Sequence, residues 1–198
     1  MLRVRLLNTS GFTMMELLVA MTIAMVILAG VTKTFILQAK TYNAQQQINE
    51  MEENARGVLD VVTRDLKMAG YNPNGATFNG ITYNTTQLLI QADLDASGGI
   101  STSSTANEQI AYAYDGTNKQ ITRTVGVGSA SVLADNITAF SFSYLDSGGA
   151  ATIISANIRQ VAISITAQTA SADPDYTSNG GYRTYTVTAT TTPPNLAL

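Results

Sequence analysis

The sequence predicts an α+β fold, in which one long amino-terminal helix packs on an antiparallel β-sheet domain. Three observations lead to this prediction: an apolar segment at residues 12–35, an amphipathic helical pattern at 36–70, and alternation of apolar and polar residues through much of 71–198. The 198 residues suit one domain of ordinary size with an appended anchor.

The composition excludes several classes of function. The formal net charge is −3, which argues against nucleic acid as a partner, because phosphate binding requires an excess of lysine and arginine. The chain has no cysteine, so disulfides, cysteine zinc sites and thiol catalysis are ruled out. It also has no histidine, the commonest general base, and it has no hydrolase or nucleotide-binding fingerprint. We therefore expect no enzymatic activity.

The apolar segment is long enough to cross a membrane. It has no charged residue between 17 and 32, and a bilayer requires about 20 apolar residues. Arg3 and Arg5 precede it, which predicts that its amino-terminal end lies in the cytoplasm and that the β-domain lies outside. A cleaved secretory signal fits poorly, because no cleavage site of small residues follows the segment. The sequence therefore favours a retained helix with a processing point before it, at Gly11–Phe12.

The start of the segment, G-F-T-x-x-E-L-L-V-A, resembles the class III leader of type IV pilins and of type II secretion pseudopilins. In that family a prepilin peptidase cuts after the glycine and methylates the new amino terminus. The resemblance implies a leader peptide of residues 1–11, cleavage between Gly11 and Phe12, and N-methylation of Phe12. It also implies that Glu16 is the assembly residue. A simple signal anchor is the alternative, because the amino terminus of a helix favours an acid.

Glu16 is an acid at the head of an apolar helix. An ionised carboxylate inside a bilayer costs about 2.5–3.5 kcal/mol on insertion scales. Cleavage creates a positive amine at Phe12, about one helical turn away, and Glu16 can neutralise such an amine on its own chain or on a neighbouring subunit. We interpret Glu16 as a residue that fixes the axial register of packed subunits, and the alternative is a carboxyl group that is merely protonated.

The helical pattern continues beyond the apolar segment. Apolar residues recur at spacings of three and four, namely at Ile48, Met51, Ala55, Val58, Val62, Leu66 and Ala69. Gly70 and Pro73 predict the end of the helix. A coiled-coil seam is the alternative, but Asp65 interrupts it, so packing of 36–70 against a sheet is favoured.

Alternating residues predict seven strands after Gly70, at 80–83, 87–92, 109–115, 120–125, 137–145, 158–167 and 183–190. Apolar residues on one face and serine or threonine on the other predict one antiparallel sheet with one side covered. We expect the helix to insert Val58, Val62 and Leu66 against Phe142 and Ile163. The aromatic residues of strand 137–145 are interpreted as core rather than as a surface that stacks a ligand.

Three stretches narrow the resemblance, namely RDLKMAGYNP, LADNITAFSFSYLD and IRQVAISITAQT. They resemble W-type (PilW-like) minor pilins, which are relatives of J-type pseudopilins, although the final TPPNLAL departs from that pattern. The resemblance implies a subunit of the initiating or tip complex of a type IV pilus. Its implied partners are other minor pilins, the major pilin, the prepilin peptidase, an inner-membrane assembly platform and a tip adhesin. The implied location is the inner membrane with a periplasmic β-domain, and then the pilus at the cell surface.

Two other functions stay open. A J-type pseudopilin of a type II secretion system would assemble in the same way but would serve export. A membrane-anchored binding module for glycan or protein would keep its function without Glu16.

The loop QADLDASGGISTSS is the best candidate for a metal site. Asp93, Asp95 and Ser97 match positions one, three and five of an EF-hand calcium loop. Position twelve is Ser104, where a bidentate glutamate is needed. Calcium binding and a solvated loop are both open, and no other cofactor is expected.

Overall fold

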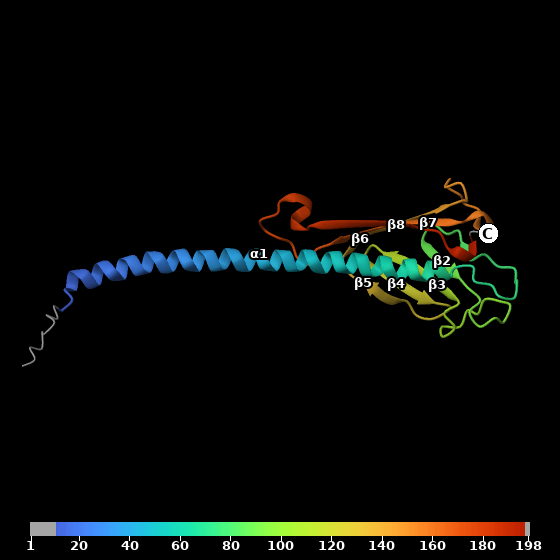
Figure 1. The fold of residues 1–198 in the computed structure, drawn as a ribbon, viewed down its shortest axis with the longest axis horizontal. Helices are drawn as coiled ribbons and strands as arrows, with labels where there is room; N and C mark the ends of the chain where they lie inside the picture. Colours follow the sequence, from blue (N-terminus) through green and yellow to red (C-terminus); the bar gives the residue numbers. More distant parts are fainter. Residues whose placement is uncertain (1–10, 197–198) are drawn as a thin grey trace, which may run out of the picture. The chain divides into compact units, whose positions relative to one another are not determined.

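The structure is a computed structural model that describes residues 11–196. The chain forms two compact units, Met1–Gln45 and Gln46–Leu198, which we describe separately. Helix α1, Met14–Met68, runs through both of them (Figure 1). Arg3 and Arg5, from which the cytoplasmic end of the helix was predicted, lie outside the described residues.

The described part of the first unit is the amino-terminal portion of α1. By length and composition, α1 is the one described helix that could cross a membrane. Its large apolar side chains in this portion are exposed, namely those of Met14, Met15, Leu17, Leu18, Val19, Met21, Ile23, Met25, Val26, Ile27, Leu28, Val31, Phe35, Ile36 and Leu37. Such a surface is stable only when lipid or other apolar side chains cover it.

The second unit combines the rest of α1 with two antiparallel sheets. The five-stranded sheet has the order β1-β2-β3-β4-β5, with strands Ile81–Thr82, Gln87–Gln91, Gln109–Asp115, Gln120–Val125 and Ser131–Ala134. The three-stranded sheet has the order β6-β7-β8, with strands Ile137–Leu145, Gln160–Gln168 and Thr184–Thr191. Short 3-10 turns lie at Ser155–Asn157, Ser178–Gly181 and Pro194–Leu196.

The predicted antiparallel β-domain is confirmed, but its strands form two sheets instead of one. The chain turns sharply after β5, where Asn136 has a φ of 58°, and β6 then pairs with β7 instead of continuing the first sheet. The two sheets meet through the Tyr114 hydroxyl, which donates to the carbonyl oxygens of Ile137 and Thr138 at 3.1 and 2.9 Å. The four-residue strand β5 had not been predicted, because its length gives little periodic signal.

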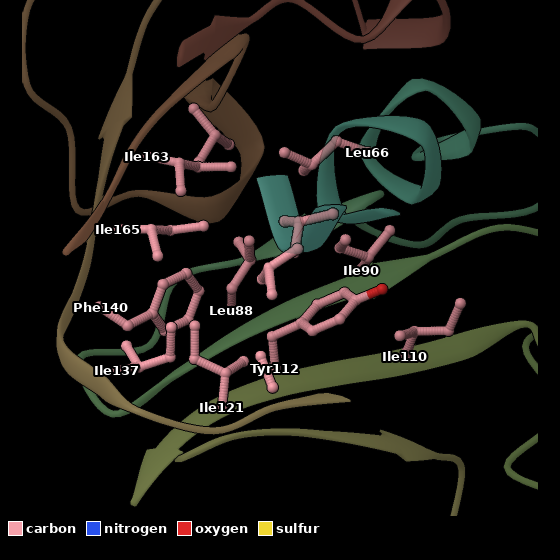
Figure 2. Packing of buried hydrophobic residues seen from close by; sticks show 14 of the residues in the cluster. Leu66, Leu88, Ile90, Ile110, Tyr112, Ile121, Ile137, Phe140, Ile163 and Ile165 are labelled. Atoms are coloured by element: carbon pink, nitrogen blue, oxygen red, sulfur yellow. The ribbon is translucent and has the colours of Figure 1, made fainter. Parts of the chain in front are cut away.

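One face of α1 closes the core between the two sheets (Figure 2). The helix buries Val58, Val62 and Leu66 as predicted, and Ile163 is buried opposite them, whereas Phe142 is only half-buried. The ring of Phe142 lies 5.5 Å from that of Phe140 and 5.7 Å from that of Tyr144. Phe140 and Tyr144 belong to the buried core, so the aromatic residues of β6 serve packing, as expected.

The carboxyl-terminal end of α1 is bonded to the five-stranded sheet through a glycine. Gly70, at the predicted stop, has a φ of 76°, the left-handed conformation that commonly ends a helix. Its N–H donates to the carbonyl oxygen of Gln91 at 2.9 Å. A side chain on Gly80 would come within 2.4 Å of the Gly70 nitrogen, so two glycines are needed where the backbone that follows α1 touches the backbone that precedes β1.

Candidate functional site

The head of α1 is closed by a reciprocal capping box. Thr13 is the residue before the first helical turn, and its N–H donates to Oε2 of Glu16 at 3.0 Å. The hydroxyl of Thr13 donates to the same oxygen at 2.9 Å, and Glu16 N–H donates to that hydroxyl at 3.2 Å. The motif T-x-x-E is a recognisable capping signal, so this second role of Glu16 was readable from the sequence. Both contacts from Thr13 use Oε2, which leaves Oε1 on the other side of the carboxylate.

The peptide bond between Gly11 and Phe12 lies immediately outside this cap. Both residues are in irregular backbone before α1, and the Phe12 side chain is 82% exposed. A side chain placed on Gly11 would meet no atom within 4 Å, and Gly11 does not have a positive φ. The fold of this chain therefore does not require glycine at position 11.

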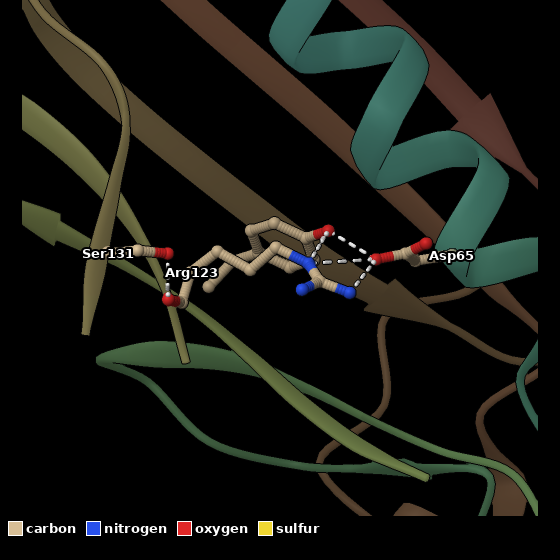
Figure 3. A network of polar contacts seen from close by, with 4 residues as sticks. Asp65, Arg123 and Ser131 are labelled. Carbon is tan, nitrogen blue, oxygen red and sulfur yellow. Dashed lines mark hydrogen bonds and ion pairs between the residues drawn. The ribbon is translucent and has the colours of Figure 1, made fainter. Parts of the chain in front are cut away.

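A buried polar cluster joins α1 to the five-stranded sheet (Figure 3). The Tyr112 hydroxyl on β3 donates to Oδ2 of Asp65 at 2.5 Å. Arg123 on β4, which is directly opposite Tyr112 in the ladder, donates to the same oxygen from Nε and Nη2 at 3.3 and 3.2 Å. Burial, together with the hydrogen bond to Asp65, raises the pKa of Tyr112, so the phenol stays protonated and able to donate. The residue that interrupts the apolar seam is thus an anchor for the helix.

The loop between β2 and β3 gathers three carboxylates. Carboxylate oxygens of Asp93, Asp95 and Glu108 lie within 4.8 Å of one another, and those of Asp93 and Glu108 belong to buried residues. Hydrogen bonds from the side chain and backbone of Ser97 lower the pKa of Asp95, which favours its ionised form. Three acids at this separation repel one another, and a hard cation would relieve the repulsion.

The structure brings together two of the three predicted ligands and adds one that was missed. Ser97 contributes its backbone N–H, which donates to Oδ1 of Asp93 at 3.0 Å and to Oδ1 of Asp95 at 2.9 Å. Glu108 accepts backbone N–H groups of the same loop, including that of Ser101 at 2.7 Å. These bonds hold the loop together. Calcium binding by Asp93, Asp95 and Ser97 stays a prediction from the sequence.

The calcium prediction is tested by thermal unfolding of the full chain in detergent. Millimolar calcium is expected to raise Tm, because an ion that binds only the folded state adds its binding free energy to stability. Asp95→Asn is expected to reduce the increase strongly, because it removes one negative charge from the group while its amide oxygen can still accept the N–H of Ser97.

Asp115→Asn is the matched control. Asp115 also orders a turn, by accepting the N–H groups of Thr117 and Asn118 at 2.9 and 3.1 Å, but it is not part of the three-carboxylate group. This variant should keep the calcium response. Unchanged Tm of the wild-type chain in calcium would mean a solvated loop.

Comparisons with known proteins match both parts of the chain. A prokaryotic N-terminal methylation motif matches residues 6–32, which include the capping box and the Gly11–Phe12 bond. The sequence model of prepilin peptidase-dependent protein B matches residues 44–191, about three quarters of the chain.

Relatives from Thermus thermophilus are also found. The pilin-like protein PilA3 of this organism is 42% identical over 60 residues, which are 30% of this chain and 26% of that protein, so the match spans about a quarter of the relative's length. The solved structure of the type IV-like pilin TTHA1219 superposes with a TM-score of 0.43 at 13% identity and covers 78% of this chain and 98% of that one.

The methylation motif, the long apolar helix and the helix-on-sheet domain define a type IV pilin-like protein. Such proteins are structural rather than catalytic in type. The chain belongs to the prepilin peptidase-dependent protein B family.

Proposed function

We propose that this protein is a minor pilin, a structural and assembly subunit of a type IV pilus that acts in the initiating or tip complex. The observation that carries the proposal is the combination, in one chain, of an exposed apolar helix headed by a single acid with a folded helix-on-sheet unit. The first part suits a subunit that must be covered by other subunits, and the second provides a head domain for them to contact.

The apolar part of α1 can be covered in two ways. Before assembly, lipid of the inner membrane surrounds it, with the β-domain in the periplasm. After assembly, the helices of other minor pilins and of the major pilin replace the lipid at little cost, because apolar side chains and lipid tails are similar surroundings. The inner-membrane assembly platform then moves the subunit from the first state to the second, and the pilus tip becomes its final location, where it can support an adhesin.

Glu16 fixes the axial position that the helix takes when other subunits replace the lipid. Apolar packing alone does not fix how far one helix slides along another. The carboxylate of Glu16 can pair with the amine of Phe12 on a neighbouring subunit, and breaking a buried pair of this kind costs about 3–5 kcal/mol. Because the contacts from Thr13 are both to Oε2, the capping box and the pairing do not compete for one oxygen.

The Gly11–Phe12 bond is the proposed site of the prepilin peptidase. The chain has no structural need for glycine at position 11, so recognition by an enzyme accounts for it better than folding does. Cleavage there leaves the capping box intact, because the box begins at Thr13.

The function is tested on the native protein. Sheared filaments should contain this chain, and its intact mass should correspond to a form that begins with N-methylated Phe12. Gly11→Val is expected to retain the leader and to abolish incorporation into filaments.

Gly30→Ala is the matched control, since Gly30 is also open to a side chain but lies inside α1. This variant should be processed normally. Processed wild-type protein that never enters filaments would point to a membrane-anchored binding module, and entry into a secretion-system fibre would point to a J-type pseudopilin.

A further inference from the structure

The outer edge of β8 has an orientation that two backbone hydrogen bonds establish. Gln168 N–H donates toward β6, to the carbonyl oxygen of Asn136 at 2.8 Å, and Thr169 N–H donates to the carbonyl oxygen of Arg183 at 2.9 Å. The backbone N–H and C=O groups of Arg183 therefore face β7. In a strand, these groups of successive residues point alternately to one side and to the other. The pairing of β7 with β8 is continuous, without a bulge, from Gln168↔Thr184 to Val161↔Thr191.

It follows that four residues of β8 direct their N–H and C=O groups away from β7: Thr184, Thr186, Thr188 and Thr190. All four are exposed. Among residues 11–196, no backbone hydrogen bond beyond the ladder satisfies these groups. Figure 1 shows β8 as the long red arrow that borders its sheet.

The other three described sheet edges each have a feature that discourages strand pairing. Strand β1 is only two residues long. Strand β5 has four residues, and its register with β4 shifts between Ile121 and Thr122. Strand β6 is bulged between Ile137 and Ala139, and the hydroxyl of Tyr114 bonds to the Ile137 carbonyl. Short length, bulges and covering groups are the usual protections of a sheet edge.

Strand β8 lacks all of these protections. Its eight residues, TYTVTATT, include no proline, no charge and no bulge, and they have high strand propensity. Two nearby cations are paired with acids, Arg183 with Asp173 at 3.0 Å and Arg56 with Glu52 at 3.4 Å. A third, Lys119, lies over the ring of Tyr182, before the strand begins. The strand itself is thus neutral as well as open.

We propose that the outer edge of β8 binds an extended, uncharged segment of a different subunit, which adds a fourth strand to the β6-β7-β8 sheet. The donors and acceptors of the four threonines supply the main-chain bonds, as in other strand additions. The strand carries no charge, so a neutral segment matches it, whereas a charged segment would find no ion-pair partner on it. This inference rests on the proposed function, which supplies the neighbouring subunits.

A second copy of this chain does not fit the edge. Two copies of β8 related by a two-fold axis pair antiparallel, and this reverses the direction of residues 46–68 of α1 in one copy. The two segments would then run in opposite directions, which does not suit subunits that enter one filament in the same direction. A two-fold β8–β8 pair is therefore disfavoured, and the proposal assigns the edge to a segment of a different protein.

Thr188→Pro in the full chain tests the proposal. Proline removes an outward N–H and no ladder bond, so Tm should stay near that of the wild type, whereas incorporation into filaments should fall by about tenfold or more. Thr188→Ala keeps the N–H and should assemble normally. Val187→Pro removes an N–H that faces β7, and it should lower Tm, which checks the assigned orientation.

Hydrogen exchange of peptides within 182–192 gives a second readout on the unmodified protein. The outward amides should exchange freely in the detergent-solubilised chain and about tenfold or more slowly in filaments. Fast exchange in filaments, or normal incorporation of folded Thr188→Pro, would overturn the inference. Absence of the wild-type chain from filaments would instead overturn the proposed function, and if Thr188→Pro does not fold, the exchange measurement decides.

Discussion

Glu16→Gln is expected to lower incorporation into filaments by about a hundredfold or more while leaving membrane insertion unchanged. Glutamine can still accept the N–H of Thr13, so the capping box survives. Only the negative charge is lost, and an amine on a neighbouring helix then stays unpaired at a cost of about 3–5 kcal/mol. The measurement is the ratio of this chain in sheared filaments to that in membranes, determined by quantitative mass spectrometry.

Thr13→Val tests the capping role of Glu16 separately from its proposed charge pairing. This variant keeps the size of the side chain and the charge of Glu16, but it removes the hydroxyl that bonds to both the carboxylate and the Glu16 N–H. We expect incorporation within a few-fold of the wild type. If Thr13→Val and Glu16→Ala both abolish incorporation while Glu16→Gln does not, Glu16 acts as a helix cap and the charge-pairing proposal fails.

Asp65→Ala is expected to lower the free energy of unfolding by about 3–5 kcal/mol, because the Tyr112 hydroxyl and the Arg123 guanidinium would lose their shared acceptor in a largely buried site. The measurement is denaturant unfolding of the full chain in detergent. The loss should exceed that of any exposed polar substitution on the same helix.

The control for this effect is Glu52→Ala. Glu52 forms an ion pair with Arg56 on the exposed side of the same helix at 3.4 Å, and its loss should cost less than about 1 kcal/mol. The triple variant Asp65→Leu/Tyr112→Phe/Arg123→Leu should recover much of the stability lost in Asp65→Ala, since it removes the buried charge along with both of its partners. Equal destabilisation by Asp65→Ala and Glu52→Ala would show that the buried cluster is not an anchor.

Local patterns were sufficient to predict most of the elements. The spacing of Val58, Val62 and Leu66 identified the buried face of α1, and Gly70 identified its end. The expected strands at 109–115, 120–125 and 137–145 coincide with β3, β4 and β6. In each case the signal is a periodicity of side chains or a backbone requirement, and both are properties of neighbouring residues.

Features that depend on residues far apart in the chain were not predicted from the sequence. The division into two sheets depends on which strand β6 pairs with, and alternation within a strand does not specify its partner. Glu108 joins Asp93 only because the loop folds back on itself, and Arg123 reaches Asp65 only through the register of β3 with β4. The capping role of Thr13 is different, because its motif lies within four residues and could have been read from the sequence.

The attachment of α1 to its sheets has a mechanical consequence. Tension applied along residues 46–68 would not peel the helix off one turn at a time, because its end is held at Gly70 by Gln91 and its side by Asp65. The load would act as shear, and the apolar seam from Met51 to Leu66 would have to slip as a whole. A head domain built in this way resists pulling forces better than its modest size suggests.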